Sequence, residues 1–167
     1  MPASAPASLR ITHIGNADLH RIATLARRIW PEAFAGILPA DQIPAMLDEI
    51  YAIDTLRADI ALRGHVYWIA LIDGHDAGYL SAYRQADRLW IKKIYVDAAC
   101  RGRGIGRHLL DKAQAHFAPI GSVALNVNDG NTAAIGFYQA QGFAIEAHVP
   151  VRMGPFDFHD YVMARQL

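Results

Sequence analysis

Residues 91–107, IKKIYVDAACRGRGIGR, decide the fold more than any other stretch of this chain. Their first part belongs to a predicted strand from Leu89 to Val96, and their last part opens a predicted helix from Ile105 to Phe117. Glycines alternate with other residues between the two elements, so main-chain N–H groups can converge on an anion there. The helix that follows directs its N-terminus, with its free N–H groups and partial positive charge, at the same place. The stretch therefore predicts a cradle for a pyrophosphate.

The cradle is predicted to consist of Arg101, Gly102, Arg103, Gly104, Ile105, Gly106 and Arg107, in which the arginines add positive charge. Two common phosphate loops do not fit. Leu109 stands where a dinucleotide-binding fingerprint would place its third glycine, and no Gly-Lys-Ser/Thr of a Walker loop follows. The alternative is a glycine-rich turn that only caps a helix and has solvated arginines. The strand before the loop and the long amphipathic helix after it favour the anion site.

Outward from this loop, the pattern of apolar residues predicts alternating strands and helices. Strands are predicted at residues 9–14, 66–72, 77–83, 89–96, 122–127, 143–149 and 157–167, and helices at 16–30, 41–51, 53–62, 105–117 and 132–141. Asn16 is expected to cap the first helix and Pro31 to end it. Residues 73–76 are expected to form a hairpin turn. This order predicts an α/β fold with a mixed, largely antiparallel sheet of about six or seven strands and helices on both faces.

Length and composition limit the possible functions. The chain has 167 residues, which suits a flexible tail at residues 1–8 and a single domain at 9–167. Lys plus Arg and Asp plus Glu both number 16, so no long basic footprint for nucleic acid or an anionic membrane is expected. The tail lacks the pattern of a signal peptide, and the most apolar run, residues 66–72, is too short to span a bilayer.

Cysteine and histidine usage adds two further expectations. Cys100 is the only cysteine, so no internal disulfide can form, which fits a cytoplasmic protein. None of the eight histidines has the spacing of metal ligands, so no metal is expected. Cys100 has no apparent partner that would make it an acyl-carrying nucleophile.

Two motifs now resemble a known family. Arg-x-x-Gly-x-Gly between a strand and a helix resembles motif A of the Gcn5-related N-acetyltransferases (GNAT). Residues 125–143, LNVNDGNTAAIGFYQAQGF, are similar to the family's second motif, Leu-x-Val-x-x-x-Asn-x-x-Ala-x-x-Phe-Tyr-x-x-x-Gly-Phe. The resemblance implies the acyl-CoA N-acyltransferase fold and acetyl-CoA as co-substrate. It also implies direct attack of an amine on the thioester in a ternary complex.

A closer resemblance is to the bacterial spermine/spermidine N-acetyltransferase branch. It rests on residues 30–51, 93–96, 154–156 and 160–163, and it makes a polyamine the leading acceptor. The chain departs from the family's sequence pattern at three places. Residues 98–100 stand where a proline and an aromatic residue are common. Ala140 stands in place of a lysine, and His159 in place of an acidic residue.

The resemblance assigns roles to named residues. Main-chain groups of Ile94 and Val96 are expected to bind the pantetheine arm of the cofactor, beside the phosphate loop. Tyr95, on the other face of the strand, is the residue that could border the acetyl group, and the alternative is a plain strand tyrosine. Asn131 could hold the same arm or cap its helix. Tyr138 is the expected general acid for the leaving thiolate, and it shares a helical face with Asn131. The plain alternative for Tyr138 is packing among its aromatic neighbours.

The sequence leaves several alternatives for the residues that contact the acceptor amine. Glu32, Phe34, His159 and Asp160 are the candidate substrate contacts, and the general base is left among Glu32, His159, Asp160 and a water chain. The expected partner is a small-molecule amine, and the resemblance also implies a homodimer. Alternatives with the same fold acetylate a protein N-terminus, an amino acid or an aminoglycoside, or bind CoA without catalysis.

Overall fold

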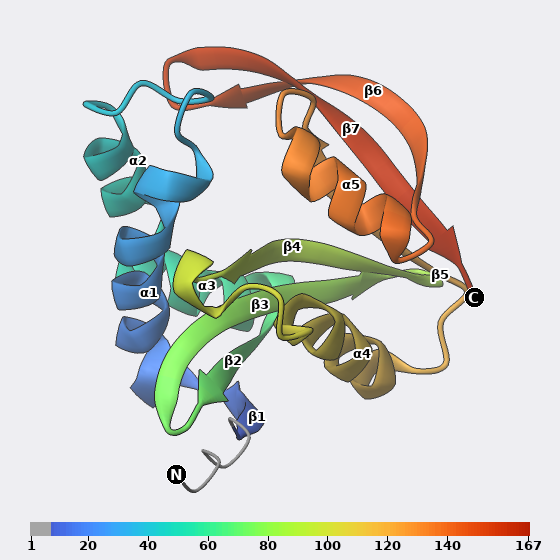
Figure 1. Ribbon diagram of the computed structural model, residues 1–167. Helices are drawn as coiled ribbons and strands as arrows, with labels where there is room; N and C mark the ends of the chain where they lie inside the picture. Colours follow the sequence, from blue (N-terminus) through green and yellow to red (C-terminus); the bar gives the residue numbers. More distant parts are fainter. Residues whose placement is uncertain (1–7) are drawn as a thin grey trace, which may run out of the picture.

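The computed structural model describes residues 8–167, which form helices packed on a twisted sheet (Figure 1). The strands are β1 (Leu9–Ile14), β2 (Val66–Ile72), β3 (His75–Gln85), β4 (Arg88–Val96), β5 (Ser122–Asn128), β6 (Ala144–Met153) and β7 (Phe156–Gln166). The helices are α1 (Leu19–Ala33), α2 (Ile43–Ile50), α3 (Ile53–Arg63), α4 (Ile105–Phe117) and α5 (Thr132–Ala140), with short 3₁₀ turns η1 (Asn16–Asp18) and η2 (Ala98–Cys100). The predicted α/β class and order of elements are confirmed.

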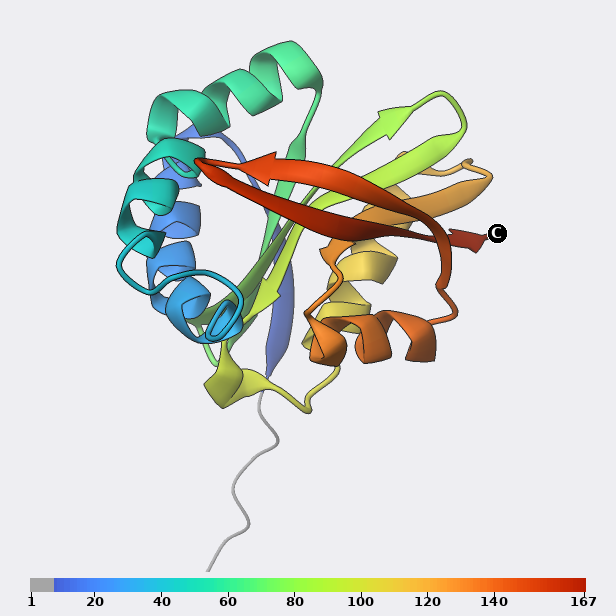
Figure 2. The same cartoon turned by 90° about the horizontal axis from the view of Figure 1, so that it is seen from above.

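The sheet has seven strands in the order β1-β2-β3-β4-β5-β7-β6. Every neighbouring pair is antiparallel except β4 and β5, which are parallel because α4 connects them. The β6–β7 hairpin extends past the rest of the sheet, and its tip lies beside α2 (Figures 1 and 2). A Cβ atom added to Gly154 at that tip would lie 4.0 Å from Met46 of α2. The hairpin therefore closes one side of the molecule over β4.

Two hydrophobic clusters hold the layers together, one on each face of the sheet. The first packs α4 and α5 on the central strands through residues such as Leu109, Leu125 and Phe143. The second packs α1, α2 and α3 on the opposite face through residues such as Ile22 and Leu56. Burial of these apolar faces supplies the main stabilisation of the fold. Alternate residues of β4 therefore face different helix layers.

Most predicted elements have their expected bounds within a few residues, with three local corrections. Pro31 does not end α1, which continues to Ala33, because Pro31 lies in the last turn and Phe34 closes that turn by donating to the Trp30 carbonyl at 2.9 Å. Asn16 makes no capping bond and lies in η1. The hairpin turn is only Asp73-Gly74, with φ angles of 49° and 81°, which match a tight two-residue turn.

His75 and Asp76, which were expected in that turn, instead begin β3. Ser8, which the predicted tail included, is held in place, since it exchanges main-chain and side-chain hydrogen bonds with Asp73 at 2.8 and 2.9 Å. The rest of the predicted tail, residues 1–7, lies outside the described part of the chain.

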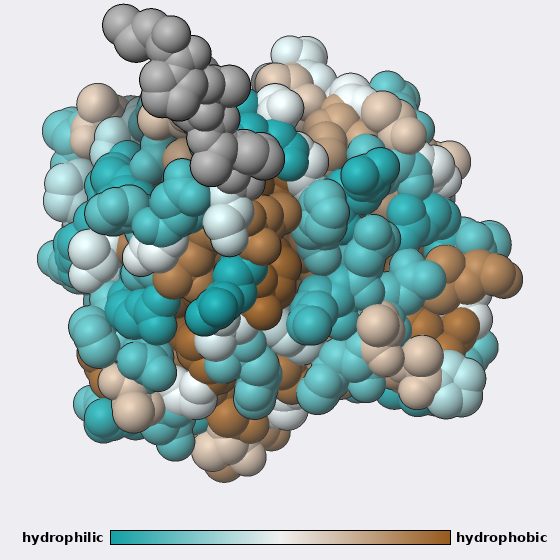
Figure 3. Space-filling model, turned by 60° about the horizontal axis from the view of Figure 1, so that its bottom comes forward, coloured by the Kyte–Doolittle hydropathy of each residue, from teal (hydrophilic) through white to brown (hydrophobic). Residues whose placement is uncertain are grey.

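The surface is mainly polar on the face shown in Figure 3, where hydrophobic residues gather in a central band and at the right margin, with smaller areas elsewhere. Among residues 8–167, the large hydrophobic residues that are exposed are Leu62, Ile145 and Leu167. Within the same residues, no helix is long and apolar enough to cross a membrane.

Candidate active site

An opening forms in the sheet where β4 and β5 part. The two strands pair only from Arg88 with Ser122 to Ile91 with Leu125. Beyond that point β4 still pairs with β3 up to Val96, and β5 still pairs with β7 up to Asn128. The facing edges of the two strands are therefore free along residues 92–96 and 126–128, and main-chain groups there can bind a ligand that enters between them.

A β-bulge marks the start of this opening. Ser81 of β3 pairs with Lys93 and the next residue, Ala82, pairs with Ile91, so Lys92 is the extra residue. Bulges bend a strand and increase its twist. The bulge therefore coincides with the place where β4 turns away from β5.

The predicted phosphate loop lies at the end of β4 and leads into α4. Gly102 and Gly104 have φ angles of 79° and 73°, a left-handed conformation that favours glycine. Among the described residues, no main-chain acceptor takes the N–H groups of residues 102–107. Arg101, Arg103 and Arg107 make no ion pair with the described part of the chain. Free N–H groups, a helix N-terminus and exposed arginines together suit a phosphate group.

α4 and α5 meet directly behind the loop. A Cβ atom on Gly106 would lie 2.8 Å from Cζ of Phe137, so only glycine permits this contact. Asn131 caps α5 by accepting a hydrogen bond from the Ala134 N–H at 3.2 Å, as the sequence indicated. The N-terminal ends of both helices thereby border the opening.

Tyr138 of α5 is buried among aromatic side chains, with its ring 5.3 Å from that of Phe137 and 5.8 Å from that of Phe143. Burial, reinforced by the neighbouring Tyr95, raises the pKa of the Tyr138 phenol. The hydroxyl therefore keeps its proton at neutral pH and can donate it. Packing among aromatic residues, which the sequence offered as an alternative, is thus compatible with a role as proton donor.

Tyr95 and Asp160 lie on the other side of the opening. The Tyr95 pKa is raised first by burial and then by the negative charge of Asp160. The Asp160 pKa is raised by burial, while a contact with the Asn126 side chain and the charge of Lys92 oppose that rise. A carboxylate with a raised pKa is better suited to accept a proton than an exposed one.

The remaining acceptor-side candidates are placed differently. Phe34 is buried beside Trp30 and Tyr95, at ring distances of 4.6 and 6.0 Å. Glu32 is exposed on the last turn of α1. His159 is exposed and lies 5.2 Å from the ring of His148, whereas Asp160 is directed toward Asn126, because neighbouring residues of a strand face opposite sides. The structure therefore brings Phe34 and Tyr95 into contact and places the charge of Asp160 near Tyr95, whereas Glu32 and His159 are exposed.

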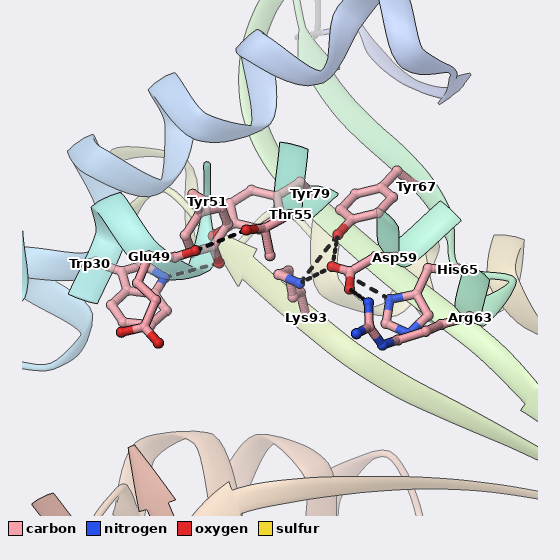
Figure 4. Close-up of polar contacts among 10 residues, drawn as sticks. All are labelled: Trp30, Glu49, Tyr51, Thr55, Asp59, Arg63, His65, Tyr67, Tyr79 and Lys93. Carbon is pink, nitrogen blue, oxygen red and sulfur yellow. Dashed lines mark hydrogen bonds and ion pairs between the residues drawn. The ribbon is translucent and has the colours of Figure 1, made fainter. Parts of the chain in front are cut away.

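One charged cluster was missed from the sequence, and it lies under β4 (Figure 4). Lys93 is only 6% exposed, and its Nζ lies 3.5 Å from Oδ2 of Asp59 and 3.2 Å from the hydroxyl of Tyr67. Burial lowers the Lys93 pKa to about 8, although Asp59 opposes this shift. The only local signal was a lysine at an inward position of an apolar strand, and its partner on α3 was not predictable from spacing.

The "Acetyltransferase (GNAT) family" profile matches residues 20–143, which is most of the chain. This chain belongs to the GNAT family of acetyltransferases. It is therefore an enzyme that transfers an acetyl group from acetyl-CoA to an amine nitrogen. An N-acetyltransferase of Mycobacterium tuberculosis (strain ATCC 25618 / H37Rv), described as uncharacterized, is 30% identical over 161 residues, covering 90% of this chain and 98% of the relative.

Solved structures share the fold of this GNAT protein. The PaiA N-acetyltransferase from Thermoplasma acidophilum, in complex with coenzyme A, has a TM-score of 0.81 at 22% identity and covers 96% of this chain and 99% of its own. The ribosomal-protein-S18-alanine N-acetyltransferase from Escherichia coli has a TM-score of 0.70 at 18% identity, with 95% and 94% covered. No group of three or more His, Cys, Asp or Glu side chains within residues 8–167 of the GNAT fold could hold a metal ion.

Proposed function

We propose that this enzyme binds acetyl-CoA and a primary amine together and that the amine attacks the thioester directly. The observation that carries the proposal is the opening between β4 and β5, with the phosphate loop at one end and a buried, protonated Tyr138 beside it. Holding both reactants in one opening replaces an encounter in solution by a reaction between neighbours. No covalent enzyme intermediate is needed.

In this proposal acetyl-CoA, the acetyl donor, binds along the phosphate loop and the free edge of β4. N–H groups of residues 102–107 and the three loop arginines bind the pyrophosphate. Main-chain groups of Ile94, Tyr95 and Val96 bind the amides of the pantetheine arm, and Asn131 borders the same arm. The Ala134 N–H donates to Oδ1 of Asn131, which leaves the amide NH₂ of Asn131 free to donate.

Tyr138 donates its proton to the thiolate of CoA as the thioester bond breaks. Its raised pKa keeps the phenol protonated until the sulfur acquires charge. Asp160 accepts the proton of the attacking amine, because its carboxylate is half-buried and its pKa is raised toward neutrality. His159 and Glu32, which were also candidates for the base, are exposed, so they lack the burial that supports Asp160 in this role.

A polyamine is the first acceptor to test. A carboxylate and the aromatic faces of Phe34 and Tyr95 suit an alkylammonium group before it loses its proton. The exposed Lys92 at the bulge opposes a highly charged acceptor. A protein N-terminus, an amino acid or an aminoglycoside would use the same donor site, and the Escherichia coli neighbour is described as acting on an alanine of a ribosomal protein.

A thiol-release assay with acetyl-CoA over a panel of amines tests the proposal. The panel includes spermidine, spermine, amino acids, aminoglycosides and short peptides with free N-termini. We expect turnover that falls roughly 100-fold or more in Tyr138→Phe. Tyr83→Phe, a change on β3 away from the opening, serves as the matched control.

Each outcome distinguishes one part of the proposal. Turnover on polyamines supports that acceptor, and turnover only on another amine rejects it while keeping the reaction. Full activity of Tyr138→Phe would reject Tyr138 as the acid. Binding of CoA with no turnover on any amine would favour the alternative of a binding module.

A further inference from the structure

A buried ion pair lies under β4 at the point where the strand leaves β5. The last paired residues are Ile91 and Leu125, Lys92 is the bulge, and Lys93 is the next residue. Lys93 extends away from the opening toward Asp59 of α3, which is 8% exposed. The pair therefore connects the free segment of β4 to the helix layer on the far side of the sheet (Figure 4).

The contacts around the pair leave Lys93 little freedom. Its Nζ approaches the rings of Tyr51 and Tyr67 at 5.6 and 5.5 Å, in addition to its contacts with Asp59 and the Tyr67 hydroxyl. Asp59 also accepts from Tyr67 at 3.2 Å, and its other oxygen accepts from Arg63 at 3.2 Å. Every oxygen of the carboxylate is thus used, which fixes where the ammonium group can lie.

Stability alone does not explain such a pair. Burying two opposite charges costs about as much as their attraction returns, and apolar side chains of similar volume often serve as well. What the pair adds is a fixed position, because moving Lys93 off Asp59 leaves the buried ammonium group without a charged partner, which is strongly unfavourable. An apolar side chain at position 93 could shift along α3 without that penalty.

The fixed position matters for the residues that follow. Tyr95 lies two residues beyond Lys93 on the same face and packs against Tyr79 at a ring distance of 5.6 Å. Ile94 and Val96 face the opposite cluster with α4. Holding Lys93 therefore holds the whole free edge of β4 that borders the opening.

We propose that Asp59 and Lys93 are a positioning pair that holds the free segment of β4 away from β5 and so keeps the acetyl-CoA opening in shape. The inference rests on the proposed binding of acetyl-CoA along that edge. Neither residue touches the reacting atoms. They affect the binding of acetyl-CoA indirectly, by fixing the position of the β4 main chain.

The double variant Asp59→Asn/Lys93→Met tests this role. It removes both charges yet keeps an acceptor for the Tyr67 hydroxyl, so we expect a melting temperature close to that of the parent. We expect the Kd for CoA, measured by calorimetry, and the KM for acetyl-CoA to rise roughly tenfold or more, since small displacements in a binding site are costly. The KM for the amine should change less.

The control variant Arg27→Met/Asp48→Asn removes an exposed ion pair of 2.7 Å between α1 and α2 and should keep the parental constants. A double variant that folds and binds CoA with the parental Kd would overturn the inference and show that the pair serves stability only. If the double variant does not fold, Tyr67→Phe, which removes one contact to each charge, replaces it. Tyr67→Phe should also weaken CoA binding, and a parental Kd there would overturn the inference.

The same measurements separate this inference from the proposed function. A parent that binds no CoA would reject both. If the parent binds CoA and transfers acetyl groups, and the variants have the same constants as the parent, only the positioning role is rejected.

Discussion

Individual side chains in this protein acquire their chemistry from burial. Burial raises the pKa values of the Tyr95 and Tyr138 phenols and of the Asp160 carboxyl group. Desolvation disfavours the charged form of each group. The proposed acid, Tyr138, is buried, and the proposed base, Asp160, is half-buried, so the two groups of the proposed proton transfers have different environments.

Asp160→Asn should remove the acidic limb of the pH–rate profile. A carboxyl group accepts a proton only when ionised, so the parental kcat/KM should fall as the pH falls through the raised pKa of Asp160. The asparagine variant should lose roughly 100-fold in kcat and show no such limb. His159→Asn, a neighbour that faces the other way, should keep it. An acidic limb that persists in Asp160→Asn would assign the base elsewhere.

His65 should make the fold less stable in mild acid. Burial lowers its pKa from 6.5 to about 4, so between these values the unfolded chain binds a proton that the folded chain does not. The free energy of unfolding should therefore fall as the pH drops from 6.5 toward 4, by an amount on the order of 3 kcal/mol.

Urea titrations of the parent and of His65→Phe measure this effect. Phenylalanine can keep the stacking on Tyr83, which His65 contacts at a ring distance of 4.9 Å, and it removes the titrating nitrogen that has no hydrogen-bond partner. The variant should lose less stability between about pH 6.5 and pH 5 than the parent. Parallel stability curves would show that His65 is not the cause.

At the scale of elements, the contact between α4 and α5 shapes the donor site. The two helices carry the phosphate loop and the pair Asn131 and Tyr138, so their separation sets the distance between the proposed pyrophosphate and thioester contacts. Gly106 permits their close approach to one another through Phe137. A glycine that serves a phosphate loop by its main chain thus also serves helix packing.

Gly106→Ala should destabilise the protein by about 1–3 kcal/mol, because its methyl group would overlap the Phe137 ring. Gly136→Ala is the matched control, since a Cβ atom there meets nothing within 4 Å in a helix. That variant should gain about 0.5–1 kcal/mol. Thermal unfolding measures both changes. Equal stability of the two alanine variants would mean that α5 moves aside at no cost.

At the scale of the whole molecule, the β6–β7 hairpin joins the two helix layers. Its strand β7 pairs with β5 along the opening, and its tip reaches α2 at Met46 (Figure 2). Asp160 and Phe34, from opposite ends of the chain, come to border Tyr95 only through this arrangement. The proposed acceptor side is therefore a property of the assembled fold and of no single segment.

A homodimer, which the family resemblance implied, stays a prediction. β6 is one of the two edge strands of the sheet, and Ile145 on it is 48% exposed. If the C-terminal strands form the interface, Ile145→Glu should weaken association by placing like charges near the contact. Sedimentation equilibrium of the parent and the variant measures this. A parent that sediments as a monomer would contradict the prediction.

The sequence by itself determined the family and the order of the elements, and it predicted the phosphate loop, because local periodicity and turn residues act over a few positions. Gly104 begins α4 and Asn131 caps α5 as their neighbours in the chain require. The local rule that a proline ends a helix was wrong at Pro31. This proline lies inside the last turn of α1, which the N–H of Phe34 closes by donating to the Trp30 carbonyl.

Only the tertiary structure decided where β4 and β5 part, that Asp160 is half-buried beside Asn126 whereas His159 is exposed, and that Lys93 meets Asp59. These relations join residues that are distant in the chain. They depend on strand register, on the bulge at Lys92 and on the packing of α3, none of which leaves a pattern in the local sequence. Burial, which arises only from this packing, then shifts the pKa values on which the proposed chemistry depends.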